Sequence, residues 1–155
     1  MTVTIFEKTC RFTDDLKIGD SVSYKNELYV VITLNITQLE SETCDVQFAA
    51  QKVGSPIISR KYREVGQIVR EQKVFNKNFT FIPTIRIGAL FQGEKGIGAI
   101  VTNIESVHYD FTDLVVKYDC EVIQEWPNSE IQKAITNNRT KKFKVLQGGK
   151  SDESL

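Results

Sequence analysis

The sequence predicts an all-β fold, a sandwich or barrel of about seven to nine antiparallel strands, with one short helix near residues 129–137. Three observations predict it. Apolar and polar residues alternate over several short stretches, which is the period of a β-strand. Glycine- and proline-containing segments separate these stretches, and only one stretch has the apolar spacing of a helix.

The first strand pair is predicted between residues 22 and 37. The even positions from 30 to 36 are apolar, whereas Thr33, Asn35 and Thr37 face the other way, so a half-buried strand is expected. The dipeptide Lys25-Asn26 before it is a turn candidate that predicts a hairpin, and Gly19-Asp20 marks an earlier turn.

A third strand is predicted over residues 44–50. Its apolar residues alternate with polar ones that are expected to face solvent. The apolar set is Cys44, Val46, Phe48 and Ala50, and the polar set is Asp45, Gln47 and Gln51. The sequence Gly54-Ser55-Pro56 then ends the strand.

A long stripe of odd-numbered apolar residues opens the second half of the chain. It comprises Phe79, Phe81, Ile85, Ile87, Ala89 and Phe91. Pro83 lies inside the stripe and cannot donate to a ladder, so an edge strand or a bulge is expected. The stretch 93–96 predicts a hairpin loop into a strand over 97–104 and lacks the residue order of a phosphate-binding loop.

The last elements are a strand, a helix and a short strand. Phe111 and the even positions from 114 to 122 predict the strand. Ser129 and Gln132 have capping-box spacing after Pro127, and Ile131 lies on the apolar face of the helix. Residues 141–146 predict the final strand.

The domain organisation follows from length and composition. With 155 residues, we expect a single β-rich domain over 1–147 and a flexible polar tail over 148–155. A subdomain break near 54–66 is the alternative.

Composition restricts the function classes. Twenty basic residues balance twenty acidic ones, so no global field draws the chain to nucleic acid or to an anionic membrane. The first residues are too polar for a signal peptide, and no apolar run is long enough to span a bilayer. Cytoplasmic synthesis without export is expected.

No catalytic, cofactor-binding or metal-binding residue is predicted, and the chain is expected not to be an enzyme. His108 is the single histidine, and it falls where a turn between two strands is expected. The three cysteines, Cys10, Cys44 and Cys120, are scattered and lie on or beside predicted core faces as reduced thiols. A carboxylate-based active site stays open, because sequence cannot place two acids at a set separation.

Two basic clusters leave a single-stranded nucleic-acid-binding barrel as an alternative. One comprises Arg60, Lys61, Arg63 and Arg70, and the other Arg139, Lys141, Lys142 and Lys144. The aromatic residues of the 79–91 stripe share a face with isoleucines, which is typical of a core and makes nucleic acid an unfavoured partner.

The stretch 75–111 resembles the β-sandwich modules of the H-type lectin group and of phage tail fibres. The matching features are the aromatic strand ending at Pro83, an apolar strand, a variable loop, Val101-Thr102-Asn103, and the aromatic Phe111. The resemblance implies a trimeric or hexameric sandwich that binds carbohydrate or belongs to an attachment device.

The expected function is therefore a non-enzymatic structural or attachment component of a multisubunit assembly, with a phage virion as the setting. Its expected partners are proteins, most simply further copies in a homo-oligomer. A lectin-like module is the alternative, because glycans bind to exposed aromatic side chains beside hydrogen-bonding groups. The candidate ligand-binding residues are Tyr109, Tyr118 and Trp126.

Overall fold

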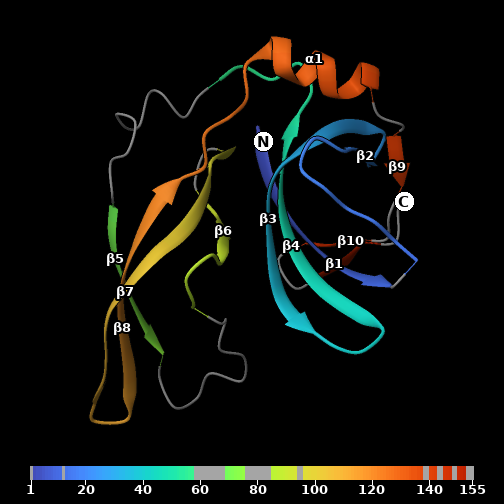
Figure 1. Ribbon diagram of the computed structural model, residues 1–155. Helices are drawn as coiled ribbons and strands as arrows, with labels where there is room; N and C mark the ends of the chain where they lie inside the picture. The colour runs from blue at the N-terminus through green and yellow to red at the C-terminus, as the bar shows by residue number, and fades with distance from the viewer. Residues whose placement is uncertain are drawn as a thin grey trace.

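The computed structural model describes residues 2–11, 13–57, 69–75, 85–93, 96–137, 140–142, 145–147 and 150–152. These residues form two β-sheets and one short helix, so the all-β prediction is confirmed (Figure 1). The seven-stranded sheet has the order β11-β10-β1-β4-β3-β2-β9, and the four-stranded sheet has the order β5-β8-β7-β6. Within the described ranges there are thus more strands than the sequence predicted.

The seven-stranded sheet is built from both ends of the chain. Its strands are β1 (Val3–Arg11), β2 (Ser21–Tyr24), β3 (Glu27–Leu39), β4 (Thr43–Lys52), β9 (Thr140–Lys142), β10 (Val145–Gln147) and β11 (Lys150–Asp152). The pairs β1–β4, β3–β4 and β2–β3 are antiparallel, whereas β2 and β9 run parallel. The expectation of purely antiparallel strands is wrong at this edge.

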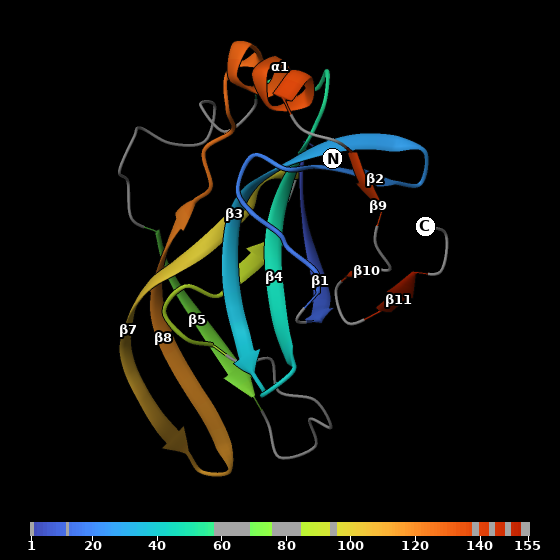
Figure 2. The ribbon, with the colours of Figure 1, turned by 45° about the vertical axis from the view of Figure 1, so that its right-hand side comes forward.

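The middle of the chain forms the four-stranded sheet. Its strands are β5 (Val69–Phe75), β6 (Leu90–Gln92), β7 (Gly98–Asp110) and β8 (Asp113–Val122). Every pairing in this sheet is antiparallel. In Figures 1 and 2 it lies beside the seven-stranded sheet, with the helix at one end of the molecule and the β7–β8 turn at the other.

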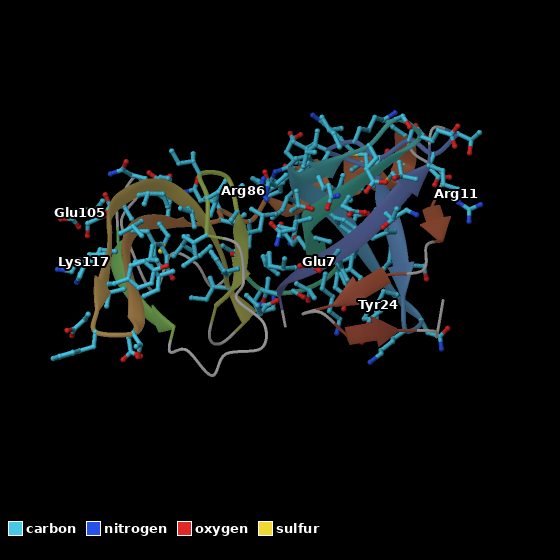
Figure 3. The ribbon with its side chains drawn as sticks, turned by 90° about the horizontal axis from the view of Figure 1, so that it is seen from below. Glu7, Arg11, Tyr24, Arg86, Glu105 and Lys117 are labelled. Carbon is cyan, nitrogen blue, oxygen red and sulfur yellow. The ribbon has the colours of Figure 1, made fainter. Side chains whose placement is uncertain are left out.

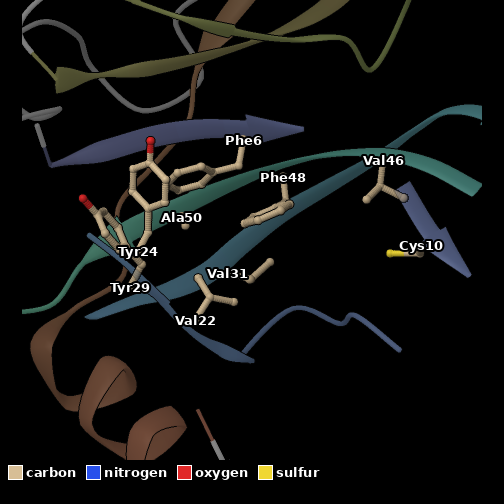
Figure 4. Close-up of a cluster of buried hydrophobic side chains, with 9 residues drawn as sticks. All are labelled: Phe6, Cys10, Val22, Tyr24, Tyr29, Val31, Val46, Phe48 and Ala50. Atoms are coloured by element: carbon tan, nitrogen blue, oxygen red, sulfur yellow. The ribbon is translucent and has the colours of Figure 1, made fainter. Parts of the chain in front are cut away.

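The seven-stranded sheet is rolled. Strands β1 and β2 stand three places apart in it, which would separate them by roughly 14 Å in a flat sheet. The ring centroids of Phe6 on β1 and Tyr24 on β2 are nevertheless only 4.8 Å apart. The rolled face encloses the cluster in Figure 4, where Phe6 also contacts Tyr29 and Phe48. Rolling therefore gives this sheet a core of its own.

The outer face of the same sheet is also buried. Val3, Ile5, Ile32 and Ala49 from the seven-stranded sheet pack against Leu90 and Ile123 from the other half of the chain. With Val31 in the inner cluster and Val30 under helix α1, Val30, Val31 and Ile32 are all buried, so the half-buried reading is wrong for this part of β3. Where a strand is buried on both faces, neither face carries solvent-exposed polar residues, so apolar and polar residues do not alternate along it.

Three glutamine side chains join the seven-stranded sheet to the other half of the chain, two of them to the four-stranded sheet and Gln51 to the segment between β8 and α1. A primary amide carries the donor and acceptor of a peptide group, so it substitutes for one residue of a ladder. Gln47 accepts from the Leu90 nitrogen at 3.1 Å and donates to the Leu90 oxygen at 3.3 Å. Gln51 pairs in the same way with the Trp126 nitrogen at 2.7 Å and oxygen at 3.0 Å.

The third glutamine makes the reciprocal connection from the four-stranded sheet. Gln92 accepts from the Ile5 nitrogen at 3.1 Å and donates to the Val3 oxygen at 3.0 Å. Neither Gln47 nor Gln51 faces solvent, which corrects the outward orientation expected from their alternation with apolar residues. Polar residues that alternate with apolar ones give the same sequence pattern whether their side chains face solvent or bind main-chain groups.

The packing beside these glutamines is close at Gly98, the first residue of β7. A Cβ on Gly98 would approach side-chain carbons of Val3 and Ile123 to 3.1 Å. This distance is tighter than ordinary van der Waals contact, so these side chains would have to shift by a few tenths of an ångström to admit a larger residue. The two sheets therefore form one packed unit where they meet.

Several turns lie where the sequence placed them. Lys25 and Asn26 connect β2 and β3, β4 ends two residues before Gly54, and β6 pairs with β7 across the 93–97 loop. The Gly93 nitrogen donates to the Ile97 oxygen and so pairs the two ends of the glycine-rich stretch, of which residues 94 and 95 lie outside the described residues.

The stripe predicted over residues 79–91 forms only the short strand β6 in its described part. Residues 79, 81 and 83 lie outside the described residues. Ile87 lies in a turn beside Gly88, whose φ is 91°, and its side chain is 65% exposed. The apolar residues at odd-numbered positions therefore extend through a turn and do not lie on one face of a single strand.

Strand β7 is longer than the predicted 97–104. It continues to Asp110, so His108 lies in a strand and the predicted turn around it is wrong. The turn falls at Phe111 and Thr112, outside β8. Val101-Thr102-Asn103 likewise lies within β7, where register shifts mark irregular pairing. Such irregularities shift the side-chain alternation and hide the strand's full length from the sequence.

Helix α1 (Asn128–Asn137) confirms the one predicted helix. Ile131 and Ala134 are buried against Val30, with Ile135 packed beside them. The helix begins one residue before Ser129, and the Pro127 oxygen accepts from the Glu130 and Ile131 nitrogens. None of the helices in the described ranges is long and apolar enough to cross a membrane.

The end of the chain returns to the seven-stranded sheet. The predicted strand over 141–146 corresponds to β9 and β10, which lie on opposite sides of the sheet order. Residues 150–152 of the predicted tail form β11, paired with β10. The remaining tail residues and most of the 54–66 stretch lie outside the described residues.

Candidate functional site

Exposed apolar side chains gather at the end of the β7–β8 hairpin. Val107 is 58% exposed, Tyr109 is 73% exposed and Phe111 is 99% exposed. We call these three residues the distal hairpin surface. Figures 1 and 2 show this turn at the end of the molecule opposite helix α1.

The distal hairpin surface continues the inner face of the four-stranded sheet. Residues opposite each other in an antiparallel pair share a face, and Val107 pairs with Val116 while Tyr109 pairs with Leu114. Val116 belongs to a buried cluster, and Leu114 packs against that cluster. The apolar face therefore extends from the core to the β7–β8 turn, and its side chains become exposed to solvent towards that turn.

The turn holds Phe111 in a conformation that disfavours its side chain. Its φ is 55°, in the left-handed region that L-residues with large side chains rarely adopt. The β2–β3 hairpin also has a two-residue turn with positive φ, and there Asn26 supplies a residue that tolerates it. Phe111 therefore stabilises this turn less than a residue that tolerates positive φ, such as asparagine or glycine, would.

The turn is also acidic. Asp110 and Asp113 are directly paired on either side of it, and like charges opposite each other destabilise a hairpin. Figure 3 views the molecule from this end and shows Glu105 and Lys117 on the outer side of the hairpin, away from the seven-stranded sheet. Along the chain, the Phe111 ring of the turn lies between the carboxylates of Asp110 and Asp113.

The end of the β3–β4 hairpin has a similar character. Ile36 and Leu39 are exposed there, beside Glu40 and Glu42. Both hairpins point towards the same end of the molecule in Figures 1 and 2. Exposed apolar residues with acidic neighbours thus recur on this end.

The structure separates the three candidate ligand-binding residues. Tyr109 is exposed on β7, whereas Tyr118 is buried, with its ring centroid 6.2 Å from that of Phe91. Trp126 is half-buried between two clusters, and its main chain is bound by Gln51. Only Tyr109 therefore has the exposure that a ligand-binding aromatic needs.

The other chemistry-bearing residues lie in three separate places. His108 is exposed on β7, whereas Cys10 and Cys44 are opposite each other on β1 and β4 and form no disulfide. Cys120 is buried in the four-stranded sheet. In the part of the chain that the structure describes, no group of three metal-ligating side chains comes together.

Two side chains with shifted pKa values, Glu27 and Tyr29, lie at the start of β3, where Glu27 forms an ion pair with Lys52. A hydrogen bond from Lys52, at 2.9 Å, lowers the pKa of Glu27. Burial raises the pKa of Tyr29, and the neighbouring Glu27 carboxylate acts in the same direction. These shifts follow from structural contacts at the opposite end of β3 from the β3–β4 turn.

Sequence reasoning missed Phe111 because it assigned this residue to a strand. The local signal was a break in alternation, since Asp110 and Asp113 flank two residues that fit neither face. Of the basic clusters, positions 60, 61, 63, 139 and 144 lie outside the described residues, while Arg70 lies on β5 and Lys141 and Lys142 lie on β9. No protein-family model, curated protein or solved structure matches this chain.

Proposed function

We propose that this chain is a non-enzymatic structural component of a multisubunit assembly, and that it associates with further copies through the distal hairpin surface. The observation that carries the proposal is the exposure of Val107, Tyr109 and Phe111 together at one end of a hairpin. The phage particle implied by the sequence resemblance is the setting we propose.

The energetics favour burial of this surface in a complex. Removing a large apolar side chain from water stabilises by roughly 1.5–3 kcal/mol. Aromatic side chains are also the residues that most often dominate a protein–protein interface, and two of the three here are aromatic. A rigid hairpin presents them without the entropy cost of ordering a loop.

The first test is the solution mass by light scattering after size exclusion. We expect a mass above the 17.7 kDa of one chain, and we expect Tyr109→Ser to lower it towards that value. Ile87→Ser is the matched control, because Ile87 is an exposed apolar residue in a different turn. A wild-type protein that stays at 17.7 kDa at every concentration would contradict self-association.

Carbohydrate binding is a second candidate function, supported by the exposure of the Tyr109 ring. An exposed aromatic ring suits the apolar face of a sugar. If this candidate is correct, a panel of monosaccharides will include one that raises the melting temperature of the wild type but not of Tyr109→Ala. No shift with any sugar would count against it.

A further inference from the structure

We propose that Cys10 and Cys44 form a reversible disulfide bond that joins β1 to β4 and stabilises the seven-stranded sheet. The register of the two strands places these cysteines opposite each other although they are far apart in the sequence. Such a bond is a modification of the chain itself, so it does not depend on the self-association proposed above.

The two cysteines are a directly opposite pair in an antiparallel ladder. Strands β1 and β4 pair without interruption, and the pair formed by Cys10 and Cys44 is followed only by Arg11 and Thr43 at the end of the ladder. A small adjustment of the main chain at this end disturbs one further pair and leaves the rest of the sheet in register.

The distance across the ladder suits a disulfide. The Lys52 nitrogen donates to the Thr2 oxygen at 2.8 Å, and counting every second pair from there makes Cys10 and Cys44 a hydrogen-bonded pair. The Cα atoms of such a pair are about 5.5 Å apart, within the roughly 4.4–6.8 Å that a disulfide spans. The Cβ atoms must approach by about 1 Å, and a bond strained in this way is readily reduced again.

Both thiols belong to the same face of the sheet. Opposite residues of an antiparallel pair share a face, and Cys44 packs against the inner cluster that contains Cys10. Figure 4 shows Cys10 at the end of this cluster away from Tyr24 and Tyr29. The two sulfurs are therefore on the same side of the ladder, as a disulfide requires.

Cys44 is the member of the pair that an external oxidant reaches first. Cys10 is 8% exposed, whereas Cys44 is half-buried and lies opposite the exposed Leu39 on its β3 side. The Cys44 sulfur donates to the Asp45 oxygen at 4.0 Å, a weak contact that permits rotation towards Cys10. Attack therefore begins at Cys44 and is completed by Cys10.

A small disulfide such as glutathione disulfide is the oxidant. The Cys44 thiol loses its proton to solvent, and its thiolate attacks one sulfur of the oxidant and releases the first glutathione thiolate. The Cys10 thiolate, formed in the same way, then attacks the Cys44 sulfur and releases the second. The cysteine sulfurs lose two electrons in total, the glutathione disulfide gains them, and the two glutathione thiolates take up the two protons.

The bond closes a covalent loop around β2 and β3, which lie between residues 10 and 44 in the sequence. A disulfide stabilises a fold chiefly by restricting the unfolded chain. We therefore expect the oxidised protein to melt about 5 °C or more above the reduced protein.

Mass spectrometry after incubation with glutathione disulfide tests the bond. We expect the wild type to lose two hydrogen atoms, to carry no glutathione and to regain both hydrogens with dithiothreitol. Cys120→Ala is the matched control, because Cys120 is buried in the four-stranded sheet, and it should behave in the same way. Cys10→Ala should stop at one glutathione on Cys44, whereas Cys44→Ala should stay unmodified.

Every other outcome overturns the proposal. A wild type that keeps all three thiols, or that carries glutathione without closing the bond, would show that the two sulfurs do not meet. A disulfide between two chains, visible on a non-reducing gel, would show that oxidation joins copies instead. A melting temperature that does not rise on oxidation would overturn the stabilising role. The wild type and Cys120→Ala decide the matter even if Cys10→Ala fails to fold.

Discussion

Replacing Ile32 with aspartate is expected to abolish the folded state. Ile32 is 6% exposed and packs between the two sheets against Val3, Ile5 and Leu90. An ionised carboxylate there would have no partner, and burial of an unpaired charge costs more than the whole stability of a typical domain of this size. Circular dichroism should show an unfolded spectrum at 25 °C.

The same substitution at Ile87 is the matched control. From sequence alone the two isoleucines are equivalent, because each lies in a stripe of alternating apolar residues. Ile87 is 65% exposed in a turn, so Ile87→Asp is expected to change the free energy of unfolding by about 0.5 kcal/mol or less. Unfolding of both variants, or of neither, would show that the assigned burial of these side chains is incorrect.

The contrast between these residues shows where sequence patterning succeeds. Alternation identifies a strand reliably when the strand itself carries no extra, unpaired residue, as over β4, where Val46, Phe48 and Ala50 are all buried. Strand β3 has register shifts after Val31 and after Ile36. Each shift changes which face the following residues occupy, so buried Ile32 and exposed Ile36 lie in one unbroken alternating pattern.

The candidate site was less accessible to sequence reasoning than the fold. Tyr109 was identified as a candidate, but Phe111 was assigned to a strand and His108 to a turn, which reverses their actual places. The two-residue turn of a β-hairpin usually contains glycine or asparagine, which makes it recognisable in the sequence. Where the turn instead holds an aromatic residue, local propensity gives the wrong boundary, and this conflict is what directs attention to the turn.

Gln51, which binds the segment between β8 and α1, supports a second prediction of large effect. Gln51 is 1% exposed, and its amide satisfies both main-chain groups of Trp126. Leucine has a similar volume but no polar group, so Gln51→Leu leaves the part-buried N–H and carbonyl of Trp126 without this partner. At roughly 1–3 kcal/mol for each unsatisfied buried group, and less for a part-buried one, we expect a loss of about 2–4 kcal/mol in the free energy of unfolding.

A glutamate at the same position should make this loss depend on pH. When protonated, its hydroxyl donates to the Trp126 oxygen and its carbonyl accepts from the Trp126 nitrogen, as the amide of Gln51 does. When ionised, it is buried and faces a carbonyl oxygen, so the folded state raises the pKa of this carboxyl above its unfolded value. The variant is then most stable below the unfolded pKa of about 4.3 and loses stability as pH rises through the folded pKa.

Denaturant unfolding of Gln51→Glu and the wild type at matched pH values measures this difference directly. We expect the gap between the two proteins to widen from acid to neutral pH, whereas Gln132→Glu, on an exposed position of α1, should show no comparable trend. A gap for Gln51→Glu that is constant with pH would mean that solvent reaches this position.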